Sequence, residues 1–141
     1  MSLSTEGVLS ESEQPMDFVN VDLNVVGSPG AEISLGSVGL LCVHEEPGLY
    51  VYELDRDGPT TLEEGLTGLC DALERVEPAV LAEVRAGARL VADAGYRVSL
   101  PNQAVQLPSP AWGLEVCQAV LQRMARCGLG FAVSLYAVQA E

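Results

Sequence analysis

The sequence predicts an α+β domain of ferredoxin-like character, a two-layer sandwich with a mostly antiparallel sheet and helices on one face. Residues 19–25 alternate strictly between apolar and polar side chains, which is typical of a half-buried strand. A stripe of leucines recurs at the spacing of one helix face: Leu62, Leu66, Leu69 and Leu73. Helical patterns of this kind stand between strand patterns along the chain, which indicates a sheet with helices packed against it.

Residues 1–17 are rich in Ser and Glu and contain no basic side chain, so we expect a disordered acidic tail. A single domain follows over residues 18–141, a length that can enclose a hydrophobic core. Its first strand covers residues 18–26 and ends in a Gly-Ser-Pro-Gly turn. We expect a short helical turn near residues 31–36 and an extended segment near residues 39–44.

The sequence LYVYEL at residues 49–54 is rich in Tyr and Val and predicts the next strand. Two overlapping capping boxes then mark the start of the leucine-striped helix: Thr60 with Glu63, and Thr61 with Glu64. Such caps provide acceptors for backbone N–H groups that the first turn of a helix leaves without partners.

A second helix is predicted to begin at Pro78, because proline is favoured in the first turn of a helix. Residues 87–100 are ambiguous, since their apolar side chains could also continue that helix. Gly87 and Gly95 both weaken a continuous helix. We therefore favour a long strand over residues 87–100, broken or bulged near Gly95.

The last helix is predicted to begin at Ser109 and Pro110, an N-cap residue followed by a proline at the first helical position. Its apolar stripe consists of four residues: Leu114, Cys117, Leu121 and Met124. Gly128 is a natural helix terminator. Residues 130–138 then form a strand that is largely apolar on both faces, which is typical of a central strand.

The charge of the chain excludes some partners. There are 20 acidic and 7 basic residues, which gives a net charge of −13. Phosphate groups would repel such a chain, so we expect no binding to nucleic acid or to anionic membranes. The sequence has neither a basic-then-apolar leader nor an apolar stretch of the roughly 18 residues that a membrane helix needs. We expect a cytoplasmic protein.

Cysteine and histidine give no support for a metal or catalytic site. The four Cys residues include no CxxC pair, and we expect reduced, structural thiols, with Cys70 and Cys117 buried on helix faces. Cys42 and His44 would share one face of a strand, but two ligands do not make a zinc site. We predict no catalytic residue, no metal site and no cofactor.

Four stretches of the chain resemble a bacterial family known as domain of unknown function 4279, over about residues 18–137. They are VDLNVVG, LYVYELD, TTLEEGLTGLCDALERVEP and WGLEVCQAVLQRMARCGLGFAVSLY. The resemblance implies an α+β fold, and it supplies no activity that could be transferred to this chain.

An acidic segment follows the first strands. Part of a calcium-loop pattern is present in Asp55, Asp57, Gly58 and Glu64, with Glu53 in place of the first Asp. A strand rather than a helix precedes this loop, so we expect no calcium site. We expect instead an acidic surface that attracts a basic protein partner. It comprises five residues: Glu45, Glu46, Glu53, Asp55 and Asp57.

Two functional hypotheses remain open. The first is a non-enzymatic binding module with an acidic surface, for example a partner-neutralising or immunity-type protein that covers a basic toxin or regulator. The alternative is a small enzyme or ligand-binding domain with a pocket between the sheet and the helices. We also expect a homodimer, because an exposed sheet edge is often paired, and Tyr50 and Tyr52 are candidate interface residues.

Overall fold

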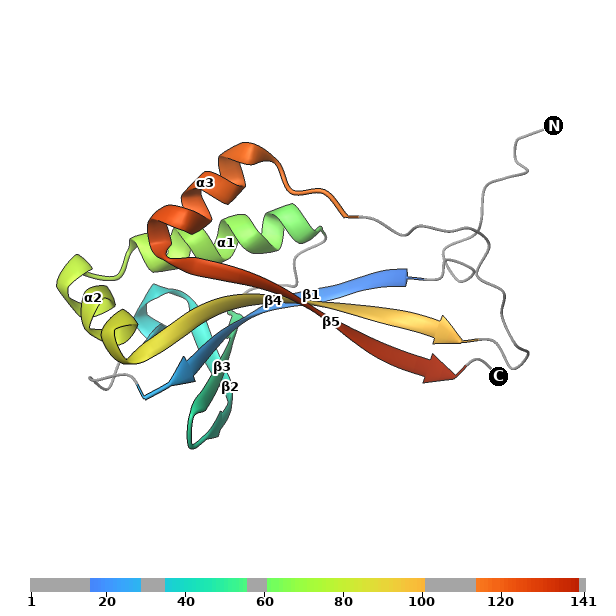
Figure 1. Cartoon of the computed structure of the whole chain (residues 1–141), viewed down its shortest axis with the longest axis horizontal. Helices are drawn as coiled ribbons and strands as arrows, with labels where there is room; N and C mark the ends of the chain where they lie inside the picture. Colours follow the sequence, from blue (N-terminus) through green and yellow to red (C-terminus); the bar gives the residue numbers. More distant parts are fainter. Residues whose placement is uncertain (1–15, 29–34, 56–60, 101–113, 140–141) are drawn as a thin grey trace.

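A computed structural model describes residues 16–28, 35–55, 61–100 and 114–139, which form a five-stranded sheet in the order β2-β3-β1-β4-β5 (Figure 1). The strands are β1 (Met16–Gly27), β2 (Leu40–Glu46), β3 (Leu49–Leu54), β4 (Ala88–Leu100) and β5 (Leu129–Gln139). Neighbouring strands are antiparallel except for β4 and β5, which are parallel. The predicted α+β class is confirmed, with a mixed sheet.

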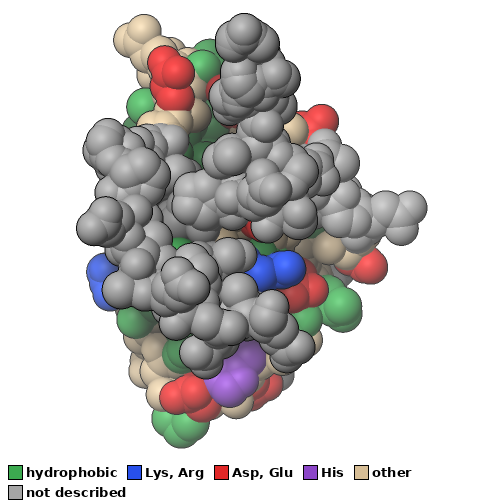
Figure 2. Space-filling model, turned by 90° about the vertical axis from the view of Figure 1, so that its right-hand side faces the viewer, with side chains coloured by type: hydrophobic (Ala, Val, Ile, Leu, Met, Phe, Trp, Pro, Cys, Tyr) green, Lys and Arg blue, Asp and Glu red, His purple; other side chains and the backbone are tan. Residues whose placement is uncertain are grey.

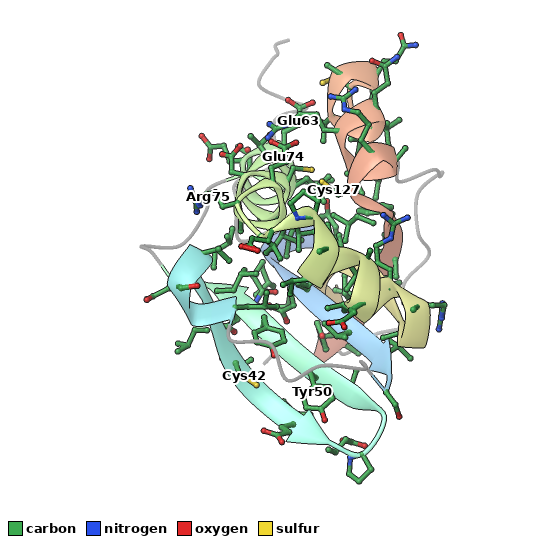
Figure 3. All side chains as sticks on the ribbon, turned by 90° about the vertical axis from the view of Figure 1, so that its left-hand side faces the viewer. Cys42, Tyr50, Glu63, Glu74, Arg75 and Cys127 are labelled. Carbon is green, nitrogen blue, oxygen red and sulfur yellow. The ribbon has the colours of Figure 1, made fainter. Side chains whose placement is uncertain are left out.

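The helices lie on one side of this sheet (Figures 1 and 3). They are the 3-10 turn η2 (Leu35–Val38) and the α-helices α1 (Leu62–Glu74), α2 (Pro78–Gly87) and α3 (Gln118–Cys127). α1 and α3 lie side by side, and α2 leads into the start of β4. The described strands and helices follow one another as βββααβαβ, and their order in the sheet differs from the expected ferredoxin-like arrangement. β2 and β3 form a hairpin, and β1 pairs with β3 rather than with β2.

The alternation in β1 positions the core. Val21, Leu23 and Val25 are buried against the helices, and the polar residues between them face the other way. The leucines of the α1 stripe lie above them, with Leu66 and Leu69 completely buried. From β4 the same layer receives Leu90, Ala92, Ala94 and Tyr96. One hydrophobic core therefore holds the helices to β1 and β4. No described helix covers the opposite face of the sheet, which we call the open face.

Polar contacts fix α1 to its neighbours. Nη2 of Arg123 on α3 lies 2.7 Å from Oδ1 of Asp71 and 2.6 Å from Oε1 of Glu74, both on α1. At the end of α1, Nη2 of Arg75 donates to the carbonyl oxygen of Val38 at 2.7 Å. Figure 3 shows Arg75 on the side of α1 away from α3. α1 is thus tied to α3 on one side and to η2 on the other.

Several predicted element boundaries are confirmed. Oγ1 of Thr61 accepts the backbone N–H of Glu64 at 3.0 Å, which caps α1 as expected. Pro78 is the first residue of α2, and Gly128 ends α3 with a φ of 72°. Of the ambiguous residues 87–100, Gly87 ends α2 and the rest form the long strand β4 (Ala88–Leu100). The irregularity opposite Gly95 lies in β1, between Phe18 and Asn20.

The predicted start and face of the last helix are wrong. Ser109 and Pro110 lie outside the described residues, but residues 114–117 are not helical and α3 begins only at Gln118. Two-residue spacing lets Leu114 and Val116 both pack against the core, as in an extended chain. Met124 of the predicted stripe is buried as expected, but the other buried side chains of α3 are Val120 and Cys127 rather than Cys117 and Leu121. Consequently Cys117 and Leu121 are exposed.

The last strand is not central. β5 lies at one end of the sheet and pairs with β4 alone among the described strands. The connection through α3 makes β5 parallel to β4 and sets it beside that strand, where the helix layer covers little of it. Among the β5 residues whose side chains are described, Leu129 alone is buried, and Leu135 is 57% exposed. The apolar pattern of residues 130–138 therefore misled the prediction of a central strand.

The described part of the chain reaches the predicted tail and contains no membrane-spanning helix candidate. β1 begins at Met16, so the last two residues of the predicted tail belong to a strand, while residues 1–15 lie outside the described ranges. Within those ranges no helix combines the length and the apolar character needed to cross a membrane.

Candidate functional site

Polar side chains collect on the open face of the sheet. Asn20, Asp22 and Asn24 alternate with the buried residues of β1 and therefore point away from the helices. Asp22 lies directly opposite Asp93 in the β1–β4 register. Glu53 follows Tyr52 in β3, which pairs with the residue after Asp22. Three neighbouring strands thus bring three half-buried carboxylates together, and we call Asp22, Glu53 and Asp93 the carboxylate cluster.

The carboxylate cluster perturbs one of its own members. The pKa of Asp22 rises from 3.8 to about 6, mainly because burial disfavours the charged form, and further because Glu53 and Asp93 are negatively charged. No described ion pair joins an arginine to these three side chains. Their negative charge is therefore not neutralised by a described neighbour on the sheet.

Hydrogen bonds hold Asp93 more firmly than Asp22. Oγ of Ser134 on β5 lies 2.8 Å from Oδ1 and 3.0 Å from Oδ2 of Asp93. Nδ2 of Asn24 donates to Oδ2 of Asp93 at 3.3 Å, and Nδ2 of Asn20 donates to Oδ1 of Asp22 at the same distance. Asp93 is thus fixed by two side chains, and Asp22 accepts from one amide.

The aromatic ring of Tyr136 borders this polar surface. A Cβ atom at Gly95 would lie 3.0 Å from Cε2 of Tyr136 and 3.1 Å from Oδ1 of Asn20. The absence of a side chain at Gly95 therefore lets the ring and the amide approach the backbone of β4. Tyr136 remains half exposed and extends the open face toward the edge strand.

The hairpin of β2 and β3 carries part of the predicted acidic surface. Glu45 pairs with Tyr50, whereas Glu46 pairs with Leu49, so the two glutamates lie on opposite faces of the sheet. Nε2 of His44 lies 2.6 Å from Oε1 of Glu46. In Figure 2 the imidazole (purple) lies beside acidic side chains at the lower end of the molecule.

The remaining predicted acidic residues separate at the end of β3. Glu53 lies on the open face beside Asp22. Asp55 is exposed beyond the strand, and its backbone N–H donates to the carbonyl oxygen of Gly39 at 2.8 Å. Asp57 lies outside the described residues. Of the five residues predicted for one surface, the structure brings only Glu53 into the carboxylate cluster.

The predicted common face of Cys42 and His44 is wrong. The β2–β3 register shifts between these residues, so Cys42 pairs with Tyr52 while His44 pairs with Val51 on the opposite face. The thiol of Cys42 donates to the carbonyl oxygen of His44 at 3.5 Å instead of facing its imidazole. Within the described ranges, no group of three His, Cys, Asp or Glu residues is placed to hold a metal ion.

The other cysteines divide into buried and exposed. Cys70 on α1 and Cys127 at the end of α3 (labelled in Figure 3) are buried, and Cys117 is exposed just before α3. Burial raises the pKa of Cys70 to about 11 and also raises that of Cys127. Both buried groups are therefore neutral thiols at neutral pH, as expected of structural cysteines. The prediction of a buried thiol at Cys117 is wrong.

The expected interface residues Tyr50 and Tyr52 do not lie at a sheet edge. They pair with Val25 and Leu23 in β1, and both pack against the hydrophobic core. β3 has strands on both sides, so neither ring is placed to join a second sheet.

Of the carboxylate cluster, only Glu53 was predicted from the sequence as a site residue, and Asp22 and Asp93 were not. The signal for Asp22 is the polar half of the β1 alternation, Asn20-Asp22-Asn24, which marks one polar sheet face. No such signal exists for Asp93, because it lies in the segment that could have been helix or strand. No family model matches the chain, and no curated protein or solved structure shows significant similarity to it. The resemblance to domain of unknown function 4279 stays a prediction.

Proposed function

We propose that this protein is a non-enzymatic binding module whose open sheet face binds a basic protein partner and neutralises it. The observation that carries this proposal is the carboxylate cluster, Asp22, Glu53 and Asp93, on three adjacent strands without a described arginine ion pair. Like charges this close raise one another's free energy, and a cation from a partner would remove that repulsion.

The chemistry of the open face favours an arginine or lysine side chain. Carboxylates accept hydrogen bonds from guanidinium groups in a planar, two-pronged geometry, and asparagine amides beside them can accept further N–H groups. Ser134 and Asn24 already orient Asp93, so little side-chain freedom remains to be lost when a partner binds. Arg89 and Arg97 lie on β4, four residues before and four residues after Asp93. The region of hydrogen-bond acceptors around Asp93 therefore ends at an arginine in each direction along the strand.

The net charge of −13 supports the same proposal at longer range. A strongly negative protein attracts a positive one before contact and raises the association rate. The exposed Glu46 near the tip of the hairpin would add to this field without belonging to the cluster. We propose that the module acts in the cytoplasm, for example by covering a basic toxin or regulator.

The test compares three forms of the chain as bait in the cells from which it comes. One is the native chain, and the second carries Asp22→Asn, Glu53→Gln and Asp93→Asn. The third is a control with Glu77→Gln, Glu83→Gln and Glu115→Gln, three exposed positions away from the open face. We expect a protein rich in Lys and Arg to be retained by the native chain and the control, and lost by the cluster variant.

The retained protein is then purified and its association rate is measured at increasing salt. The association rate should fall about tenfold for the cluster variant, and the native rate should fall as salt screens the charges. Equal weakening by both sets of substitutions would contradict the proposal, because net charge alone would then explain binding. Retention of no basic protein would contradict it as well.

A further inference from the structure

The edge strand β5 has the features of an interface and none of the features that protect a sheet edge. It is 11 residues long, its sequence contains no charged residue and no proline, and only β4 pairs with it among the described strands. Large apolar side chains are exposed along it: Phe131, Val133, Leu135 and Tyr136. A long, uncharged, apolar edge of this kind readily pairs with another strand.

The opposite edge of the same sheet shows the contrast. β2 is interrupted by an irregular register between Cys42 and His44, and its last residues include the charged pair Glu45 and Glu46. Bulges and charges are the devices by which natural proteins prevent edge-to-edge pairing. One edge of this sheet is therefore protected and the other is not.

We propose that β5 is a dimerisation strand, which pairs antiparallel with β5 of a second copy and joins the two sheets into one. A strand that pairs antiparallel with itself is self-complementary about a two-fold axis. With the axis at Val133, Phe131 of each copy lies opposite Leu135 of the other. Both sheets then present their helices on the same side, because paired residues share a face.

The apolar side chains of β5 continue the hydrophobic core to the edge. Phe131, Val133 and Leu135 pair with Ala92, Ala94 and Tyr96, whose side chains are buried under the helices. The helix layer ends before it covers the β5 residues, so they remain exposed in one copy. In the dimer, each set of three packs side by side with the same three residues of the second copy.

The lack of charge on the β5 edge favours a second copy of the chain as its partner, rather than the basic protein of the proposed function. Two chains of net charge −13 repel each other wherever their acidic side chains approach, so they can meet only over an uncharged surface. β5 is such a surface, whereas the carboxylate cluster lies on β3, β1 and β4. The two surfaces adjoin at Ser134, which contacts Asp93, but strand pairing at the edge leaves the open face of each copy accessible.

The experiment measures the mass of the full chain by sedimentation velocity at increasing concentration, together with one edge variant and one control. We expect the native chain to sediment at twice 14.9 kDa and Leu135→Lys to sediment as a monomer. The control, Leu41→Lys, makes the same change at an equally exposed residue of the β2 edge and should remain dimeric. A native monomer at high concentration, or a Leu135→Lys dimer, would overturn the proposal.

A cross-link tests the register without a charge at the edge. Val133→Cys is made in a chain with Cys42→Ser and Cys117→Ser, which removes the exposed native thiols. Residues on the two-fold axis have Cβ atoms roughly 5 Å apart, close enough for a disulfide between copies. Oxidation should convert this variant to a covalent dimer, and Leu41→Cys in the same background should stay uncross-linked. The reverse pattern would place the interface at β2.

Discussion

Replacing Asp22 by Asn is expected to stabilise the protein at neutral pH. The pKa of Asp22 is about 6 in the folded protein against an ordinary value of 3.8. For a fully shielded group, this difference would oppose folding by about 3 kcal/mol once the carboxyl is ionised. Asp22 is only half-buried, and solvent screening reduces the expected gain of Asp22→Asn to about 1 kcal/mol.

The pH dependence gives this prediction its sign. Because the folded protein holds the Asp22 proton more tightly than the unfolded chain, stability falls as the pH rises from about 4 to about 6. The Asp22→Asn variant lacks this loss. Its advantage is therefore absent below about pH 4 and complete above about pH 6.

Urea denaturation followed by circular dichroism at both ends of this pH range measures the effect. At neutral pH the melting temperature should also rise by about 4 °C, as expected for about 1 kcal/mol in a domain of this size. Glu115→Gln removes one negative charge at an exposed position before α3 and should leave both quantities unchanged. A loss of stability on Asp22→Asn, or an equal gain at pH 4 and pH 7, would refute the reasoning.

The remaining predictions concern the core and the turns. Cys70→Ser should lower the free energy of unfolding by about 1–3 kcal/mol, because burying a hydroxyl costs more than burying a thiol. Cys42→Ser, at an exposed position, should change it little. Equal effects of the two substitutions would contradict this prediction. Thiol titration of the native protein should label the two exposed cysteines and reach the two buried ones only after denaturation. Gly27→Ala should cost about 3 kcal/mol by chemical denaturation, since φ is 129° and the added Cβ would lie 2.6 Å from the carbonyl oxygen of Gly87. Gly48→Ala has open space and should cost only about 1 kcal/mol for its positive φ.

Local sequence patterns predicted most of the elements, because each depended on interactions within a few residues. The alternation of β1, the stripe and cap of α1, and Pro78 at the start of α2 all belong to this kind. The start of α3 was harder, since Leu114 and Val116 satisfy an extended pattern and a helical one begins only beyond Cys117. Hydrophobicity alone does not distinguish these two periods over so few residues.

The order of the strands in the sheet depends on long-range pairings that local sequence patterns do not indicate. The apolar sequence of β5 predicted a central strand, but an edge that forms an interface would have the same composition. The carboxylate cluster could not be predicted from local patterns either, because it depends on the register of β1 against β4. A register shift of one residue would turn Asp93 to the helix side. Only Glu53 entered the prediction, and it did so through its place in an acidic segment rather than through its neighbours.

The position of β1 affects how the chain can fold during synthesis. β1 is synthesised before the other described strands, yet it lies between β3 and β4 in the finished sheet. Its partners in β4 follow about 60 to 80 residues later, so this pairing closes a long loop. Until β4 is made, β1 can pair with β3 alone, and its other side stays unpaired. The nascent chain therefore carries a temporary open edge, and the two halves of the protein must fold together rather than in succession.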